Sequence, residues 1–185
     1  MLQLKGPTLA PFEMKNGKVV QRFSVFGVER HELWQHGSKL RDVDTFEMRD
    51  WCNIVAVTAE GAIVLVWQWR FGTRAFSLET PGGVIDPGES PLDGARRELL
   101  EETGYASDDW SPLIENDPNP ALQGNRCFSF VARNARKVRD PGGGDADEQL
   151  QVELVDSGDA KALVFEGHVR HCLCQMALLA FALKF

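Results

Sequence analysis

Residues 82–105 carry, in order, the signals for a turn, a helix start and a helix stop. Asp86-Pro87-Gly88-Glu89 places Pro and Gly at the second and third positions, which is typical of a type II turn. Ser90 suits the N-cap, Pro91 suits the first helical position, and Gly104 suits the left-handed residue that ends a helix. Because these local preferences agree, the sequence predicts a loop followed by a helix that ends at Gly104.

Three glutamates crowd one face of this predicted helix. Glu98, Glu101 and Glu102 are spaced at i, i+3 and i+4, so a helix places them side by side, where like charges repel. A hard divalent cation would turn that repulsion into binding, because such ions take carboxylate oxygens as ligands. The alternative for such glutamates is a solvated acidic helix face.

The fixed residues of the segment resemble the Nudix box in identity and spacing. The matching residues are Gly83, Glu89, Arg97, Glu98, Leu99, Glu101, Glu102, Gly104 and Tyr105. By this resemblance the chain is identified as a member of the Nudix hydrolase family. The resemblance implies a mixed α/β (α+β) fold, with a mixed β-sheet sandwiched between helices. It also implies Mg²⁺- or Mn²⁺-dependent hydrolysis of a nucleoside diphosphate linked to another moiety.

The resemblance implies the metal ligands as well. Glu98 and Glu102 are the principal ligands and catalytic residues, Glu101 assists them, and the carbonyl of Gly82 is an additional ligand. Divalent ions fit this chemistry, since they neutralise the charge of a pyrophosphate and lower the pKa of a bound water.

Four further residues of the box support these ligands. The resemblance implies that Arg97 and Glu89 hold the loop against the helix and orient the glutamates, which places Arg97 among the catalytic residues. Gly83 and Gly104 are required for the conformation of the backbone.

Segments outside the box look like the ADP-ribose and nucleoside diphosphate sugar pyrophosphatase branch. Glu79-Thr80-Pro81-Gly82-Gly83 matches its E-x-P-[AG]-G entry, and Gln68-Trp69-Arg70 resembles its Q-Y-R strand end. Pro120 and the acidic segment Asp147-Glu148-Gln149-Leu150 are similar to elements that this branch carries after the box. The branch implies cleavage to a nucleoside monophosphate and a sugar phosphate.

The acidic segment suggests Glu148 as the general base, because a carboxylate can take a proton from a water acidified by metal. Three glycines at 142–144 would let this loop close over the substrate. The alternatives are a solvated acidic loop, or Glu153 as the base.

Four residues are candidates for binding the substrate. Arg70 suits the phosphates or a surface ion pair, and Glu79 belongs to the branch's entry motif. Trp51 and Trp69 suit stacking on a nucleobase, or packing in a core or dimer contact.

Two other functions remain open. A nucleoside triphosphate or dinucleoside polyphosphate hydrolase of the same family would share the box. A non-catalytic nucleotide-binding Nudix module would have the fold without turnover, although such modules tend to lose box glutamates that this chain keeps.

Two domains are expected: an N-terminal antiparallel β extension at 1–50 and a hydrolase domain at 51–185. In the extension, Asn16-Gly17 and His36-Gly37-Ser38 are predicted to be turns between strands. The extension is too short and polar to be stable alone, so it is expected to add a sheet to its own core or to a partner in a homodimer.

The remaining elements follow from residue patterns. Strands are predicted within 51–70, 75–80, 126–133 and 150–155, a loop at 105–124, and a helix after residue 169.

Charge and cysteine content exclude several classes of protein. The formal net charge of −7 argues against binding to nucleic acid or to anionic membranes, so the expected ligand is a small-molecule nucleotide. The four cysteines are too sparse for a secreted disulfide scaffold, and no apolar stretch is long enough to span a membrane. A cytoplasmic location is therefore expected.

A cluster of His168, His171, Cys172 and Cys174 near the C-terminus matches no common zinc spacing. It favours a buried helix in which cysteine acts as a small hydrophobic residue.

Overall fold

The computed structural model describes residues 4–142 and 149–185. The chain divides into two compact units, Met1–Met48 with Asn119–Gly124, and Arg49–Pro118 with Asn125–Phe185.

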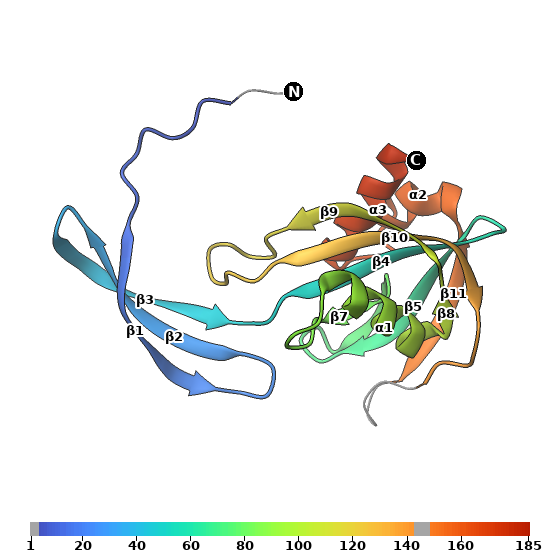
Figure 1. Ribbon diagram of the computed structural model, residues 1–185, viewed down its shortest axis with the longest axis horizontal. Coiled ribbons are helices and arrows are strands. Elements are labelled where there is room, and N and C mark those ends of the chain that lie inside the picture. Colours follow the sequence, from blue (N-terminus) through green and yellow to red (C-terminus); the bar gives the residue numbers. More distant parts are fainter. Residues whose placement is uncertain (1–3, 143–148) are drawn as a thin grey trace. The chain divides into compact units, whose positions relative to one another are not determined.

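The smaller, N-terminal unit is an antiparallel meander (Figure 1). Its strands are β1 (Glu13–Arg22), β2 (Gly27–Gln35) and β3 (Ser38–Glu47). The predicted turn at His36-Gly37 joins β2 to β3, with φ of 51° and 78°, the positive values that a two-residue hairpin turn requires.

The predicted turn at Asn16-Gly17 was wrong. These residues lie inside β1, where the pairing with β2 shifts register between Lys15 and Lys18. Asn16 has a φ of 53°, so the Asn-Gly pair forms a β-bulge instead of a hairpin turn. The connection to β2 lies at residues 23–26, where the Phe23 N–H donates to the Phe26 carbonyl at 2.8 Å.

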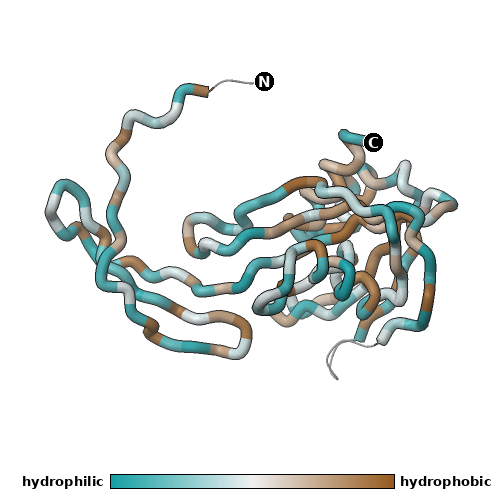
Figure 2. The backbone as a smooth tube through the Cα atoms, in the orientation of Figure 1, coloured by the Kyte–Doolittle hydropathy of each residue, from teal (hydrophilic) through white to brown (hydrophobic). Residues whose placement is uncertain are grey.

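This meander buries almost nothing of its own. Of the residues that the structure describes in the N-terminal unit, only Gly27 is buried, and β1 is exposed along its whole length. Apolar residues lie scattered among polar ones along its strands (Figure 2), and Met14, Val20 and Leu40 are each about half exposed, at 49%, 49% and 53%. A sheet without a buried face is marginally stable in water, so these faces favour a covering partner.

The larger unit is a mixed sheet with helices on both faces (Figure 1). Its strands are β4 (Trp51–Thr58), β5 (Ala62–Arg70), β6 (Ala75–Glu79), β7 (Gly82–Val84), β8 (Tyr105–Ala106), β9 (Asp109–Asn116), β10 (Cys127–Lys137) and β11 (Leu150–Asp156). Its helices are α1 (Pro91–Thr103), the 3₁₀ turn η1 (Ser157–Asp159), α2 (Ala160–Phe165) and α3 (Cys172–Lys184). The sheet order is β11-β5-β4-β10-β8, with β6 beside β5, β7 beside β4 and β9 beside β10.

Successive side chains of the central strands point to opposite faces of the sheet, and this produces two core clusters. Val55 and Leu65 face the cluster that includes α2 and α3, whereas Ile54 and Val64 face the cluster that includes α1. Both faces of the sheet are thus covered, which is why β4 and β5 read as continuous apolar runs (Figure 2). The predicted mixed sheet between helices is confirmed.

The predicted loop at 105–124 was wrong, because β8 and β9 occupy much of it. Pro112 hides the strand pattern, since proline cannot donate to a sheet ladder. Among the described residues β9 pairs only with β10, and the register shifts between Ser129 and Phe130, next to the position that Pro112 faces.

Helix α1 has the caps that the sequence predicts. Ser90 accepts a hydrogen bond from the Asp93 N–H, and Gly104 ends the helix at φ 74° with its N–H donated to the Leu100 carbonyl. The Gly104 carbonyl accepts from the Val138 N–H at 2.9 Å, so the chain after β10 crosses close to the end of α1.

No helix of the described residues is long and apolar enough to cross a membrane.

Gly104→Ala is expected to lower the free energy of unfolding by at least about 2 kcal/mol, because it combines left-handed strain with a steric clash. A Cβ on Gly104 would lie 2.1 Å from the Arg139 carbonyl oxygen. Urea unfolding should compare it with Gly88→Ala, which has a positive φ without a clash, and with Gly72→Ala, which has neither. Equal stability of Gly104→Ala and Gly72→Ala would contradict this assignment.

Candidate metal centre

The two glycines that follow Pro81, at the start of β7, lie against the glutamates of α1. The Gly82 N–H donates to Glu102 Oε2 at 2.9 Å. A Cβ on Gly83 would lie 2.5 Å from Glu98 Oε1, so any other residue would displace that carboxylate from its position. A Cβ on Gly82 would lie 2.2 Å from the Cys52 carbonyl oxygen of β4. The two glycines therefore allow β7 to lie between the core strand β4 and the carboxylates.

Arg97 joins the loop to the helix through five hydrogen bonds. Its guanidinium donates to both oxygens of Glu89, each at 3.1 Å, and to the Val84 carbonyl at 3.0 Å. It also donates to Glu98 Oε1 at 2.8 Å and Glu101 Oε2 at 3.1 Å. One planar fork thus fixes the loop, the helix and two of the three clustered carboxylates, a geometry that lysine cannot reproduce.

The hydrogen bonds between Arg97 and Glu89 shift the pKa of each group so that its charged form is favoured. The hydrogen bonds from Arg97 hold the pKa of Glu89 below its ordinary value, and those from Glu89 raise the pKa of Arg97. Both groups therefore stay charged at neutral pH. One guanidinium faces several carboxylates, so the cluster keeps a net negative charge.

The donor atoms here suit a hard divalent cation. Glu98, Glu101, Glu102 and the Gly82 carbonyl offer only oxygen atoms, which are the ligands that a hard divalent cation prefers. The side chains of Glu98 and Glu101 are 14% and 45% exposed, which leaves a side open for a ligand with phosphates. The residues present fit such an ion.

Arg70 and Glu79, both predicted to bind substrate, pair with each other. Arg70 Nε and Nη2 donate to the two oxygens of Glu79 at 2.9 and 2.7 Å. Burial would raise the pKa of Glu79, but the hydrogen bonds and charge of Arg70 outweigh it and the pKa is lowered. Glu79 is 2% exposed, so toward a substrate it acts by positioning Arg70, whose side chain is 42% exposed.

The predicted stacking tryptophans differ in exposure. Trp69 is 43% exposed and contacts Phe76 edge-on, with ring centroids 5.3 Å apart. Trp51 is partly buried at the start of β4, opposite Val84 of β7.

The proposed base Glu148 lies outside the described residues, and its alternative Glu153 lies within β11, opposite Leu65.

Two contacts of this region were missed by sequence reasoning. The Val84 carbonyl is a backbone acceptor, for which no side-chain signal exists. Cys174 Sγ lies 3.9 Å from Glu79 Oε2, although 95 positions separate the two residues in the chain. Only the fold brings them together.

Comparisons with known proteins agree on one family and one fold. Residues 48–173 match the NUDIX domain. The ADP-ribose pyrophosphatase of Bacillus subtilis (strain 168) is 28% identical over 184 residues, covering 100% of this chain and 96% of that protein. The putative nudix hydrolase 2 of Caenorhabditis elegans is 33% identical, covering 91% of this chain and 80% of that protein. A crystal structure of an ADP compounds hydrolase has a TM-score of 0.82 at 24% identity, with 95% of each chain covered.

Arg97→Lys is expected to lower the free energy of unfolding by about 2 kcal/mol at neutral pH, since it keeps the charge but loses the fork. The matched control is Arg96→Lys on the same helix, where a single exposed contact to Asp93 at 3.3 Å is lost. That control should change stability by less than about 0.5 kcal/mol. Urea unfolding measures both, and equal effects would show that the fork does not organise the loop.

Proposed function

The chain belongs to the Nudix family of hydrolases, and from this membership we propose that it cleaves the pyrophosphate bond of nucleoside diphosphate sugars, including ADP-ribose. The products would be a nucleoside monophosphate and a sugar phosphate. The substrate class is supported by the likeness over the whole chain to the Bacillus subtilis ADP-ribose pyrophosphatase. The E-x-P-[AG]-G segment that ends in Gly82-Gly83 supports it from the residues themselves.

The observation that carries the proposal is the set of oxygens around β7 and α1. We propose that Glu98 and Glu102, assisted by Glu101 and the Gly82 carbonyl, hold Mg²⁺ or Mn²⁺. When bound, such an ion neutralises pyrophosphate charge and acidifies a water. Arg97 orients Glu98 and Glu101 through its fork, and the Gly82 N–H orients Glu102. These residues hold their geometry before a substrate arrives, which lowers the cost of binding it.

Arg70 supplies the positive charge that this acidic chain needs for an anionic substrate. Glu79 holds one edge of the Arg70 guanidinium through two hydrogen bonds, and the exposed part of Arg70 is proposed to contact the substrate phosphates. Trp69 and Trp51 are proposed to stack on the base, an interaction that tolerates different bases. Glu148 is proposed as the general base from its place in the sequence alone, with Glu153 as the alternative.

No specific observation favours the other two functions. A hydrolase of triphosphates or dinucleoside polyphosphates would use the same oxygens, and a non-catalytic module would not require the intact glutamate set that this chain keeps.

The four free cysteines support the proposed cytoplasmic location, because thiols persist in a reducing compartment.

Glu102→Gln is expected to lower kcat on ADP-ribose by about 100-fold or more while leaving the melting temperature near that of the wild type. The amide oxygen of glutamine can still accept the Gly82 N–H, so the fold is retained. The control is Glu166→Gln, an exposed carboxylate after α2, which should leave turnover unchanged.

The assay is a panel of nucleotide sugars and triphosphates in Mg²⁺ or Mn²⁺, with products identified. Monophosphate release from nucleotide sugars is expected. Pyrophosphate release from triphosphates, with the sugars untouched, would instead favour the second function. Tight binding without turnover in either metal would favour the third.

We further propose a homodimer in which a second copy covers the N-terminal meander. The exposed apolar side chains of a sheet that buries almost nothing support this. Sedimentation equilibrium should give twice the chain mass of 20.6 kDa, and Val20→Glu with Leu40→Glu should shift it toward one chain mass. A monomeric wild type would contradict the proposal.

A further inference from the structure

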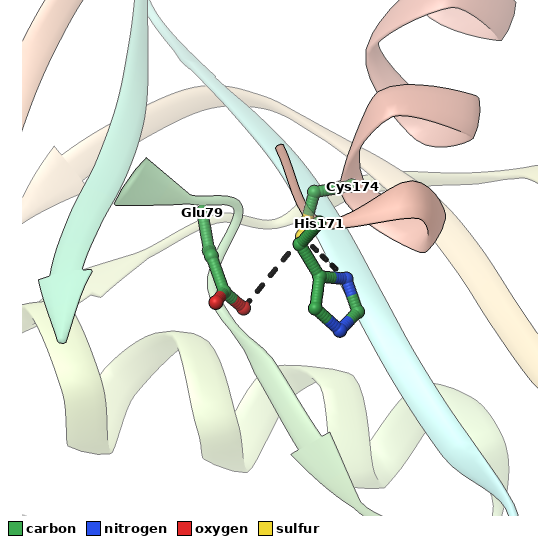
Figure 3. A group of neighbouring side chains, drawn as sticks. All are labelled: Glu79, His171 and Cys174. Atoms are coloured by element: carbon green, nitrogen blue, oxygen red, sulfur yellow. Dashed lines mark hydrogen bonds between the residues drawn. The ribbon is translucent and has the colours of Figure 1, made fainter. Parts of the chain in front are cut away.

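We propose that Glu79, His171 and Cys174 form a second metal site, for a borderline-soft divalent cation of the zinc class (Figure 3). It would use none of the α1 glutamates. Cys174 belongs to the core cluster of α2 and α3, whereas the α1 glutamates lie on the helix that covers the other face of the sheet.

The distances between the ligand atoms resemble those of a tetrahedral site. Cys174 Sγ lies 3.5 Å from His171 Nδ1 and 3.9 Å from Glu79 Oε2, and the three ligand atoms all lie within 4.8 Å of one another. Zinc bonds of about 2.3 Å to sulfur and about 2.0–2.1 Å to nitrogen or oxygen separate tetrahedral ligands by about 3.4–3.6 Å. Small side-chain movements would therefore complete the site.

Rigid elements hold each ligand. His171 is the N-cap residue of α3 and makes no capping hydrogen bond with its side chain, and Cys174 follows at i+3 on the same helix face. Glu79 ends β6, and Arg70 holds its carboxylate at 2.9 and 2.7 Å. Figure 3 shows the His171 ring and the Glu79 carboxylate on either side of the contacts made by Cys174.

Burial and donor type select the ion. Glu79 and Cys174 are each 2% exposed, whereas His171 is only partly buried, so an ion would enter past the imidazole. Sulfur and imidazole nitrogen suit zinc and related ions, and they suit Mg²⁺ poorly. Burial lowers the pKa of His171, so its imidazole is neutral and can bind metal at pH 7.

A weakly satisfied hydroxyl beside Cys174 supports a fourth position. Thr80 is 2% exposed, and the Cys174 thiol is the one group close enough to its buried Oγ1 to act as a weak hydrogen-bond partner among the described residues. A thiol is a weak hydrogen-bond partner for a buried hydroxyl. A water in the open position of a three-ligand site would give this hydroxyl a stronger partner.

Two features make the site weaker than a structural zinc site. Burial raises the pKa of the Cys174 thiol to about 12, so binding must release its proton. Arg70 already occupies Glu79 and repels a cation. One carboxylate and one thiolate face the two positive charges of the ion, and Arg70 leaves one positive charge over. A reversible site is therefore expected rather than one on which folding depends.

The test is a titration of the metal-free full chain with Co²⁺, a spectroscopic substitute for zinc, in excess Mg²⁺ to occupy hard oxygen sites. One equivalent should give thiolate-to-cobalt charge-transfer absorption, and Zn²⁺ should abolish it by competition. Cys174→Ser should remove the band, and His171→Asn should weaken Co²⁺ binding about 10-fold or more. The matched control is Cys172→Ser, which removes the exposed cysteine of the same helix and should keep the band.

Circular dichroism establishes that each variant is folded, and His171→Asn keeps the test decisive if Cys174→Ser does not fold. No charge-transfer band in the wild type, or a band that survives His171→Asn unchanged, would overturn the proposal. Loss of the band in Cys172→Ser would do the same. The readout is independent of hydrolysis, so its failure leaves the proposed function untouched.

Discussion

The arrangement of this chain depends on one guanidinium. Four carboxylates within a short segment would repel one another. The Arg97 guanidinium offsets this by donating hydrogen bonds to three of them and to the Val84 carbonyl. Loop and helix are therefore held together by charge-assisted hydrogen bonds as well as by apolar packing. The net charge left over is negative and entirely on oxygen, which is the condition that a hard cation requires.

A second guanidinium–carboxylate pair includes Glu79, which lies three residues before Gly82. Arg70 and Glu79 join the ends of β5 and β6, and Glu79 in turn contacts Cys174 of α3. The short segment from Glu79 to Gly83 thus connects two clusters of different chemistry. The α1 cluster is hard and made of oxygen, whereas the α3 cluster contains sulfur and nitrogen, so the two would select different ions.

Local interactions decided how much could be predicted from the sequence. The turn, both caps and the helix of residues 86–104 were predicted because each signal lies within a few residues of its effect. Asn16-Gly17 was misjudged because a positive φ serves a bulge as well as a turn, and β9 was missed because Pro112 hides an edge strand. The contact between Glu79 and Cys174 depends on the whole fold, so cysteine and histidine spacing alone gave no sign of a third ligand.

The central claim is that Arg97 and the two glycines hold carboxylates ready for a divalent cation beside β7. The most direct measurement is anomalous diffraction from crystals of the full chain soaked in Mn²⁺. The account predicts a peak about 2.1 Å from oxygens of Glu98 and Glu102, with the Gly82 carbonyl completing the protein ligands. A peak that lies away from these oxygens, or none at saturating Mn²⁺, would contradict it.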